Sequence, residues 1–203
     1  MHWLGNNIAN SNTRVRQGEQ AKIVNKNSKL QVAILTSSDR AAAGAYADLS
    51  GPALRELVTS ALDADVAALR ILPDDREQLA GQLRTWADTG ANGNALDLIL
   101  VTGGTGFAPR DVTPEATRDV IEKEAPGLAE VMRMTSLQHT PHAMLSRAVC
   151  GIRGRTLIIN LPGSPRGATE NLRAILPALP HAIALLREES AAEIGHSSHT
   201  AMA

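Results

Sequence analysis

The sequence contains few aromatic residues and a single cysteine. Only 2% of its 203 residues are Phe, Trp or Tyr, although 43% are hydrophobic. The core must therefore be built from Leu, Ile, Val and Ala, which suits a buried parallel sheet covered by helices. The one cysteine, Cys150, excludes an internal disulfide and a cluster of thiolate metal ligands. Its flanks are typical of a strand, so we interpret it as a buried structural thiol rather than a nucleophile.

The sequence also has no long apolar run and no large excess of charge. No stretch approaches the roughly 18–20 apolar residues that span a bilayer, and the first 29 residues lack the apolar segment of a secretory signal. We therefore expect a cytoplasmic protein with no membrane partner. The formal net charge of −1 provides no overall basic field, so we also expect no nucleic-acid partner.

The two ends differ in composition from the central part. Residues 1–29 contain five Lys or Arg and one acidic residue, Glu19, which gives a charge of +4, and their few apolar residues follow no period. We predict a disordered N-terminal extension over 1–29, one domain over 30–188 and a flexible C-terminal tail over 189–203. A start codon assigned too far upstream explains the extension equally well.

Between these ends, apolar strands alternate with amphipathic helices. The alternation predicts one three-layer α/β domain, a mostly parallel sheet flanked by helices and joined by right-handed crossovers. Two short runs within 148–163 predict an antiparallel hairpin with a buried second arm. One helix is expected over 113–127, with Thr113 as its cap. The other expected elements are strands within 30–39, 64–72 and 96–104, and helices within 51–62, 75–90 and 169–189, the last interrupted by Pro177 and Pro180.

Polar clusters follow the expected strands at their carboxyl ends, which is where ligands bind in open α/β sheets. Because the ends of parallel strands meet at one edge of a sheet, we expect these clusters to lie together. The clusters are Ser37, Ser38, Asp39 and Arg40 after the first strand, Pro73 to Asp75 after the second, Thr102 to Asp111 after the third, and "NLPGSPRG" after the hairpin.

The sequence "TGGTG" after the third strand has the features of a phosphate-binding loop. Gly103, Gly104 and Gly106 let the backbone turn its N–H groups inward, and Thr105 adds a hydroxyl donor. The loop is not a Walker A motif, because no Gly-Lys-Ser follows, and it lacks the dinucleotide-binding fingerprint. Taken alone, a flexible turn explains it equally well.

Asp74 and Asp111 are the carboxylates that we expect to take part in chemistry. Phosphoryl or nucleotidyl transfer uses Mg²⁺, which one or two carboxylates and several waters hold. The alternatives are that Asp74 caps the helix beginning near Asp75, and that Asp111 is an ordinary loop residue. Arg110 either steadies a phosphate or is simply solvated.

Two further segments carry weaker signals. Pro162 and Pro165 stiffen the loop "NLPGSP", which could present fixed backbone groups to the edge of a flat heterocycle. A plain turn is the simpler interpretation of this loop, and the role of Ser164 is ambiguous. His139 and His142 have no third ligand or carboxylate at metal-binding spacing, so we interpret them as surface or packing residues.

Four stretches together resemble one family. "SSDRAAAGAYADLSGPAL", "LPDD", "TGGTGFAPRDVTPEAT" and "MLSRAVCGIRGRTLIINLPGSP" resemble, in this order and spacing, the molybdopterin adenylyltransferases. These are the bacterial Mog enzymes and the equivalent domains of gephyrin and its plant counterpart. The resemblance covers about 30–188 and implies the molybdopterin-binding fold, usually as a homotrimer. It also implies transfer of AMP from ATP to molybdopterin with Mg²⁺ and release of pyrophosphate, before a separate protein inserts molybdate.

The resemblance further implies roles for individual residues. The two important aspartates of the family correspond to Asp74 and Asp111, which are then catalytic and hold Mg²⁺. The ligand pocket corresponds to the first polar cluster, the glycine loop, the segment around Ser146 and the "PGSP" loop. The expected pocket residues are Ser37, Ser38, Asp39, Arg40, Gly103, Gly104, Thr105, Gly106, Arg110, Ser146, Pro162, Gly163, Ser164 and Pro165.

Two rival functions stay open. One is a MoaB-like paralogue that binds the pterin but adenylates it poorly, and the other is a non-enzymatic trimeric carrier that delivers molybdopterin to a partner. The glycine loop does not separate them, because MoaB sequences share it. The stretches around Tyr46 and Arg110 favour the Mog type.

Overall fold

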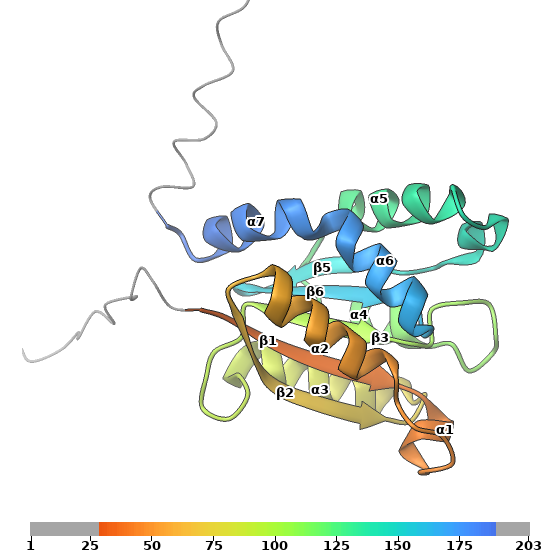
Figure 1. Cartoon of the computed structure of the whole chain (residues 1–203). Coiled ribbons are helices and arrows are strands. Elements are labelled where there is room, and N and C mark those ends of the chain that lie inside the picture. The colour runs from red at the N-terminus through yellow and green to blue at the C-terminus, as the bar shows by residue number, and fades with distance from the viewer. Residues whose placement is uncertain (1–28, 190–203) are drawn as a thin grey trace, which may run out of the picture.

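A six-stranded sheet forms the centre of the computed structural model, which describes residues 29–189 (Figure 1). Apart from Lys29 and Glu189, the predicted extension and tail lie outside the described residues. The strand order is β2-β1-β3-β6-β5-β4, in which the first four strands run parallel and the last two pair antiparallel. The strands are β1 (Leu30–Ser37), β2 (Ala64–Leu72), β3 (Leu98–Thr102), β4 (Lys123–Glu124), β5 (Cys150–Arg153) and β6 (Thr156–Leu161).

Helices cover both faces of this sheet, which confirms the predicted three layers (Figure 1). The helices α2, α5, α6 and α7 pack on one face, and α3 and α4 pack on the other. The helices are α1 (Asp39–Ala42), α2 (Ser50–Ala61), α3 (Arg76–Thr89), α4 (Thr113–Arg118), α5 (Pro126–Leu137), α6 (Pro165–Ile175) and α7 (Leu179–Leu186), with 3₁₀ turns η1 (Pro141–Leu145) and η2 (Leu176–Ala178).

The central strands are buried on both faces, as their apolar sequences predict. Neighbouring residues of a strand point to opposite faces, so Ile34 joins the cluster under α2 and α6, while Leu35 joins the cluster under α3. Each fully buried Leu or Ile side chain contributes roughly 1.5–3 kcal/mol relative to exposure. The hairpin of β5 and β6 is confirmed, and all six residues of β6 are buried.

The predicted helix over 113–127 is wrong in length and in its cap. The helix α4 ends at Arg118, and β4 then pairs antiparallel with β5. Pairing of β4, as the edge strand, with β5 outweighs helix propensity here. Pro126 also restricts the residue before it to non-helical backbone. Thr113 is the first helical residue rather than the cap, because Val112 occupies the cap position without a side-chain bond.

A buried ion pair closes the amino ends of the parallel strands. The carboxylate of Asp97, just before β3, accepts a hydrogen bond from the Gln31 amide at 2.8 Å. It also accepts two from the Arg187 guanidinium, at 2.7 and 2.6 Å. Both side chains are almost fully buried, at 12% and 13% exposed. The hydrogen bond to Asp97 raises the pKa of Arg187, so the guanidinium keeps its charge.

Cys150 lies inside the sheet, which confirms the prediction of a buried thiol. It is the first residue of β5 and is only 1% exposed. Burial raises the pKa of the thiol to about 12. The thiolate is the reactive form of cysteine, so Cys150 is chemically inert in the folded protein at neutral pH.

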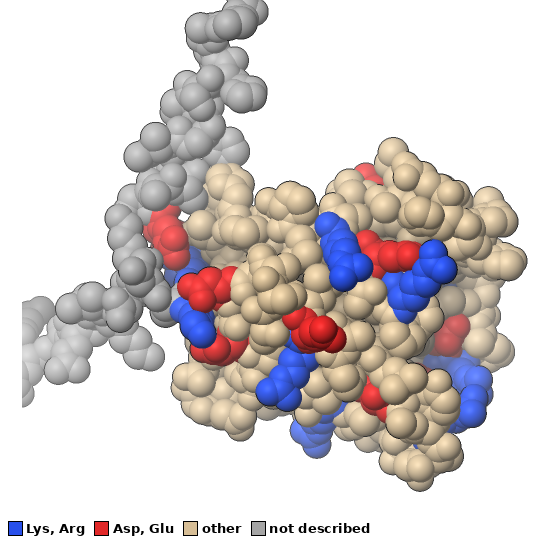
Figure 2. Space-filling model, in the orientation of Figure 1, with Lys and Arg blue, Asp and Glu red and all other residues tan. Residues whose placement is uncertain are grey.

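The surface carries charges of both signs, interspersed over the face shown in Figure 2. Several basic side chains are paired with acidic neighbours, as Arg153 is with Asp88 and Arg76 is with Asp119. These hydrogen bonds lower the pKa of both carboxyl groups. Within residues 29–189, no helix is long and apolar enough to span a membrane.

Candidate active site

A cleft of about 380 Å³ opens where the parallel strands end, and all four polar clusters contribute to it. Asp74 and Asp111 lie on this one cleft, beside the glycine loop and the "PGSP" loop. The predicted residues that line it are Ser37, Ser38, Asp74, Gly103, Gly104, Arg110, Asp111, Gly163, Ser164 and Pro165.

Asp74 is fixed in the cleft by the end of β1. Its Oδ1 accepts a hydrogen bond from the Ser37 hydroxyl at 2.6 Å, and its Oδ2 accepts one from the Asp39 amide at 3.2 Å. The Asp74 amide donates in return to Asp39 Oδ1 at 3.0 Å. The cap of α3 is Asp75, whose carboxylate accepts from the Gln78 amide. Asp74 is therefore not the N-cap residue of α3.

Asp111 closes the loop that follows the glycines. Its Oδ2 accepts a hydrogen bond from the Ala108 amide at 3.0 Å, and its own amide donates to the Ala108 carbonyl at 2.8 Å. Oδ1 of Asp111 has no hydrogen-bond partner among residues 29–189. A Cβ on Gly106 would lie 2.9 Å from Asp111 Oδ2, so only glycine lets the carboxylate lie against the loop.

The glycine loop depends on backbone that other residues rarely adopt. Gly103 and Gly104 have φ angles of +100° and +60°. A Cβ on Gly104 would lie 2.6 Å from the Thr113 hydroxyl, which is buried with no hydrogen-bond partner in the described chain. A Cβ on Gly163 would lie 3.2 Å from the Cα of Gly103. The glycine loop and the "PGSP" loop thus meet backbone against backbone.

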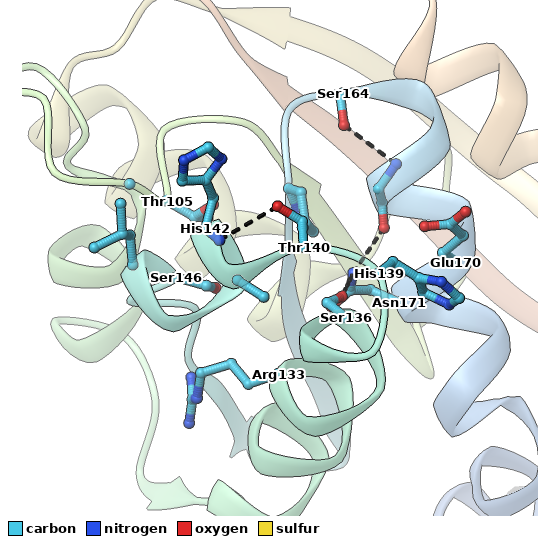
Figure 3. A pocket seen from close by; sticks show the side chains of 15 residues that line it. Thr105, Arg133, Ser136, His139, Thr140, His142, Ser146, Ser164, Glu170 and Asn171 are labelled. Carbon is cyan, nitrogen blue, oxygen red and sulfur yellow. Dashed lines mark hydrogen bonds between the residues drawn. The ribbon is translucent and has the colours of Figure 1, made fainter.

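A second pocket has a volume of about 280 Å³ (Figure 3). Ser164 lines both this pocket and the cleft. The second pocket also holds the predicted residues Thr105, Gly106, Ser146 and Pro162. His139 and His142, interpreted from the sequence as surface or packing residues, are exposed side chains on its wall.

Asn171 forms part of the wall of this second pocket and was missed in the sequence. It is 6% exposed, and its side-chain amide donates to the Ser136 hydroxyl and the Gly167 carbonyl, both at 2.8 Å (Figure 3). Because a carbonyl only accepts, this fixes the NH₂ group on that side. No sequence signal distinguishes Asn171 from an ordinary polar residue on α6.

Two predicted residues, Asp39 and Arg40, do not line the cleft themselves. Asp39 holds Asp74, as described, and the Arg40 guanidinium lies 5.2 Å from the ring centre of Tyr46.

Tyr46 does line the cleft and is 54% exposed. The sequence interpretation missed both Tyr46 and Asp48. Asp48 accepts from the Thr36 hydroxyl at 2.7 Å and from two amides at the start of α2.

The carboxylates suit a magnesium ion that is shared with a nucleotide. Among the described residues, no group of three His, Cys, Asp or Glu side chains could hold a metal alone. Mg²⁺ keeps waters and takes one or two carboxylates together with substrate phosphates, and Asp74 and Asp111 match that donor set. The open acceptor position on Asp111 Oδ1 agrees with this fit.

Comparison with known proteins points to one family. Residues 33–181 match the family described as a probable molybdopterin binding domain. The chain is 43% identical to the molybdopterin adenylyltransferase of Helicobacter pylori J99 over 158 residues, which are 77% of this chain and 88% of that protein. It is 44% identical over 156 residues, 77% of this chain, to the Drosophila melanogaster molybdenum cofactor synthesis protein cinnamon. It spans about a quarter of cinnamon and of Dictyostelium discoideum gephyrin, at 25% and 27% of their lengths.

Solved structures give the same result. A Thermus thermophilus structure described as the molybdopterin biosynthesis enzyme MoaB is 50% identical, with a TM-score of 0.72. The alignment covers 79% of this chain and 98% of that one. A MogA structure is 37% identical with a TM-score of 0.70, and it covers 77% of this chain and 99% of that one.

Proposed function

The chain belongs to the molybdopterin-binding domain family, and on that premise we propose that it transfers the adenylyl group of ATP to molybdopterin. Relatives about 43% identical carry the name molybdopterin adenylyltransferase, which supports an enzyme of molybdenum cofactor biosynthesis. The observation that carries the proposal is the shared cleft. Two carboxylates and a glycine loop line it together, which is the donor set that nucleotidyl transfer needs.

The proposed reaction exchanges one phosphorus–oxygen bond for another. An oxygen of the terminal phosphate of molybdopterin attacks the α-phosphorus of ATP and forms the new bond. The bond from the α-phosphorus to the bridging oxygen breaks, and pyrophosphate leaves with that electron pair. Since the attacking phosphate is already an anion, the step needs no general base. Positioning and charge neutralisation supply the catalysis.

The residues of the cleft divide these tasks. The backbone of Gly103 and Gly104 offers a concave, side-chain-free surface for a phosphate. Ser37 and Asp39 hold Asp74 in one orientation, and the turn at Ala108 holds Asp111. Asp74 and Asp111 would hold Mg²⁺, which neutralises charge on the triphosphate when it is bound.

We assign the two ends of the product to the two connected cavities. The pterin is proposed to enter the second pocket, near Ser146 and the Pro162–Pro165 loop. The nucleoside is proposed to lie toward Tyr46 and Leu49, whose exposed apolar surfaces line the cleft. Ser164, on the wall of both cavities, lies where the two halves of the product would join.

The assembly and setting of the enzyme are also part of the proposal. We propose a homotrimer in the cytoplasm that passes its product to a separate molybdate-inserting protein. Exposed apolar side chains on α5 provide surface that an oligomer would bury, at Val131, Met134 and Leu137. Light scattering of the purified chain measures the oligomeric state directly.

One rival function has support of its own. The structure with 50% identity is described as MoaB, so a MoaB-like paralogue that binds the pterin but adenylates it poorly is the second candidate. Incubation of the protein with molybdopterin, ATP and Mg²⁺ separates the two. Adenylyl-molybdopterin and pyrophosphate formed in equal amounts, over many turnovers, support the enzyme. Bound pterin without pyrophosphate release supports the MoaB-like paralogue or a carrier and contradicts the proposal.

A further inference from the structure

Arg147 lies next to Ser146 and bridges the segments that build the site. Its Nε donates to the Gly106 carbonyl at 2.7 Å, and one terminal nitrogen donates to the Asp111 carbonyl. The other terminal nitrogen pairs with the Glu115 carboxylate on α4. One guanidinium thus holds the beginning and the end of the Gly106–Asp111 loop.

These contacts need the shape of arginine and not only its charge. A guanidinium presents its N–H groups in a flat, fixed fork, whereas a lysine ammonium is a compact point charge on a flexible stem. Carbonyl groups at both ends of a loop, together with a carboxylate on a helix, match that fork. The Arg147 amide adds a fourth contact, to the Thr105 carbonyl at 2.9 Å. Arg147 is therefore bonded to the end of the glycine loop, at Thr105 and Gly106, and to Asp111.

We propose that Arg147 is a positioning residue, which sets where the Asp111 carboxylate lies in the cleft. This inference rests on the proposed adenylyl transfer. Arg147 contacts the main chain of Asp111 and leaves its carboxylate to the metal and the nucleotide. Since Ser146 lines the second pocket, the same segment also fixes the spacing between the pterin side and the Asp111 side of the reaction.

The chain provides a matched control in Arg153, on β5. Its Nε and one terminal nitrogen donate to Asp88 at 2.7 and 2.9 Å, and the other terminal nitrogen donates to the Val120 carbonyl at 3.1 Å. Its side chain is 23% exposed, against 33% for Arg147. Arg153→Lys therefore removes a comparable set of guanidinium hydrogen bonds. Neither Arg153 nor Asp88 lines the cleft or the second pocket.

The test compares Arg147→Lys with Arg153→Lys by three measurements. The first is kcat and KM for adenylation. The second is the affinity for Mn²⁺ with α,β-methylene ATP, a nucleotide that cannot be cleaved at the reacting bond. The third is fluorine NMR of protein labelled with fluorophenylalanine. The chain has one phenylalanine, Phe107, which lies within the Gly106–Asp111 loop, so the label gives a single signal.

For Arg147→Lys we expect kcat to fall about 100-fold, since a displacement of about 1 Å can cost that much. The KM for molybdopterin should change little, Mn²⁺-nucleotide affinity should fall, and the Phe107 signal should move or broaden. Arg153→Lys should match wild type in all three. An unchanged Phe107 signal and unchanged Mn²⁺ affinity in Arg147→Lys would overturn the inference, even if the wild-type protein proved inactive. An inactive wild type would by itself refute only the proposed function.

Discussion

The two ends of the parallel sheet use aspartate in opposite ways. At the amino ends, Asp97 is buried, and both of its oxygens accept hydrogen bonds from the chain itself. At the carboxyl ends, Asp74 and Asp111 line an open cleft, and Asp111 Oδ1 has no hydrogen-bond partner within the described part of the chain. A carboxylate whose cation comes from the same chain contributes to the fold. A carboxylate that lacks one is available for a cation brought by a ligand.

This contrast separates stability from activity along one sheet. Breaking a buried ion pair leaves an uncompensated charge and is strongly destabilising. Neutralising a cleft carboxylate removes no contact from the core, but in the proposed mechanism it removes charge stabilisation from the reaction. Substitutions at the amino end should therefore lower stability and leave kcat unchanged, whereas substitutions at the carboxyl end should lower kcat and leave stability nearly unchanged.

The largest effect is expected at the carboxyl end, for Asp111→Asn. The amide oxygen of asparagine can still accept from Ala108, so the loop should keep its shape. We expect kcat for adenylation to fall by about 100- to 1,000-fold, because the charge that holds the metal is lost. The free energy of unfolding should change by less than about 1 kcal/mol. Steady-state kinetics and urea denaturation measure the two quantities. Full activity in a folded variant would remove Asp111 from the mechanism.

The second effect is expected at the amino end, for Asp97→Ala. This change removes the buried carboxylate that accepts two hydrogen bonds from Arg187 and leaves the longer contact with Glu189, at 3.6 Å. The free energy of unfolding should therefore fall by about 3 kcal/mol. The kcat of the folded fraction should equal that of wild type. The control is Asp65→Ala at the start of β2, whose pair with Lys29 is exposed and should contribute about 0–1 kcal/mol. Equal losses of stability in the two variants would show that the buried ion pair contributes no more to the free energy of unfolding than the exposed pair does.

A smaller effect, on the pH dependence of stability, is expected from Cys150 at the start of β5. Burial raises the pKa of the folded thiol from 9.0 to about 12. Between these values the unfolded chain releases the thiol proton and the folded chain retains it, so stability falls as pH rises. The loss should be about 1.4 kcal/mol per pH unit above pH 9. In Cys150→Ala this part of the slope should be absent. Identical slopes from pH 9 to 11 in both proteins would contradict the prediction.

Much of the fold could be predicted because its signals are local. The apolar strands, the alternation with helices and the hairpin at Arg153-Gly154 each follow from a few adjacent residues. The gathering of the polar clusters followed from the rule for parallel strand ends. The prediction of one helix over 113–127 was wrong because β4 forms only through pairing with β5. That strand begins more than twenty residues later in the chain.

The parts of the site that were missed depend on distant partners. Arg147 was quoted within a motif, but its bonds to Gly106 and Asp111 join positions about forty residues apart, which no local pattern reveals. The signal for Asp48 was available, since an aspartate shortly before Ser50, Gly51 and Pro52 is typical of a helix start.

The contact between Gly103 and Gly163 limits how the site can be redesigned. At that point two main chains meet, so no choice of rotamer changes their spacing. A Cβ on Gly163 would lie 3.2 Å from the Gly103 Cα, and a Cβ on Gly103 would lie 2.2 Å from the Ser37 carbonyl oxygen. The adaptable wall is the stretch from Ala41 to Leu49, which contributes the side chains of Tyr46, Asp48 and Leu49 to the cleft. Efforts to change which nucleoside triphosphate is accepted should begin there.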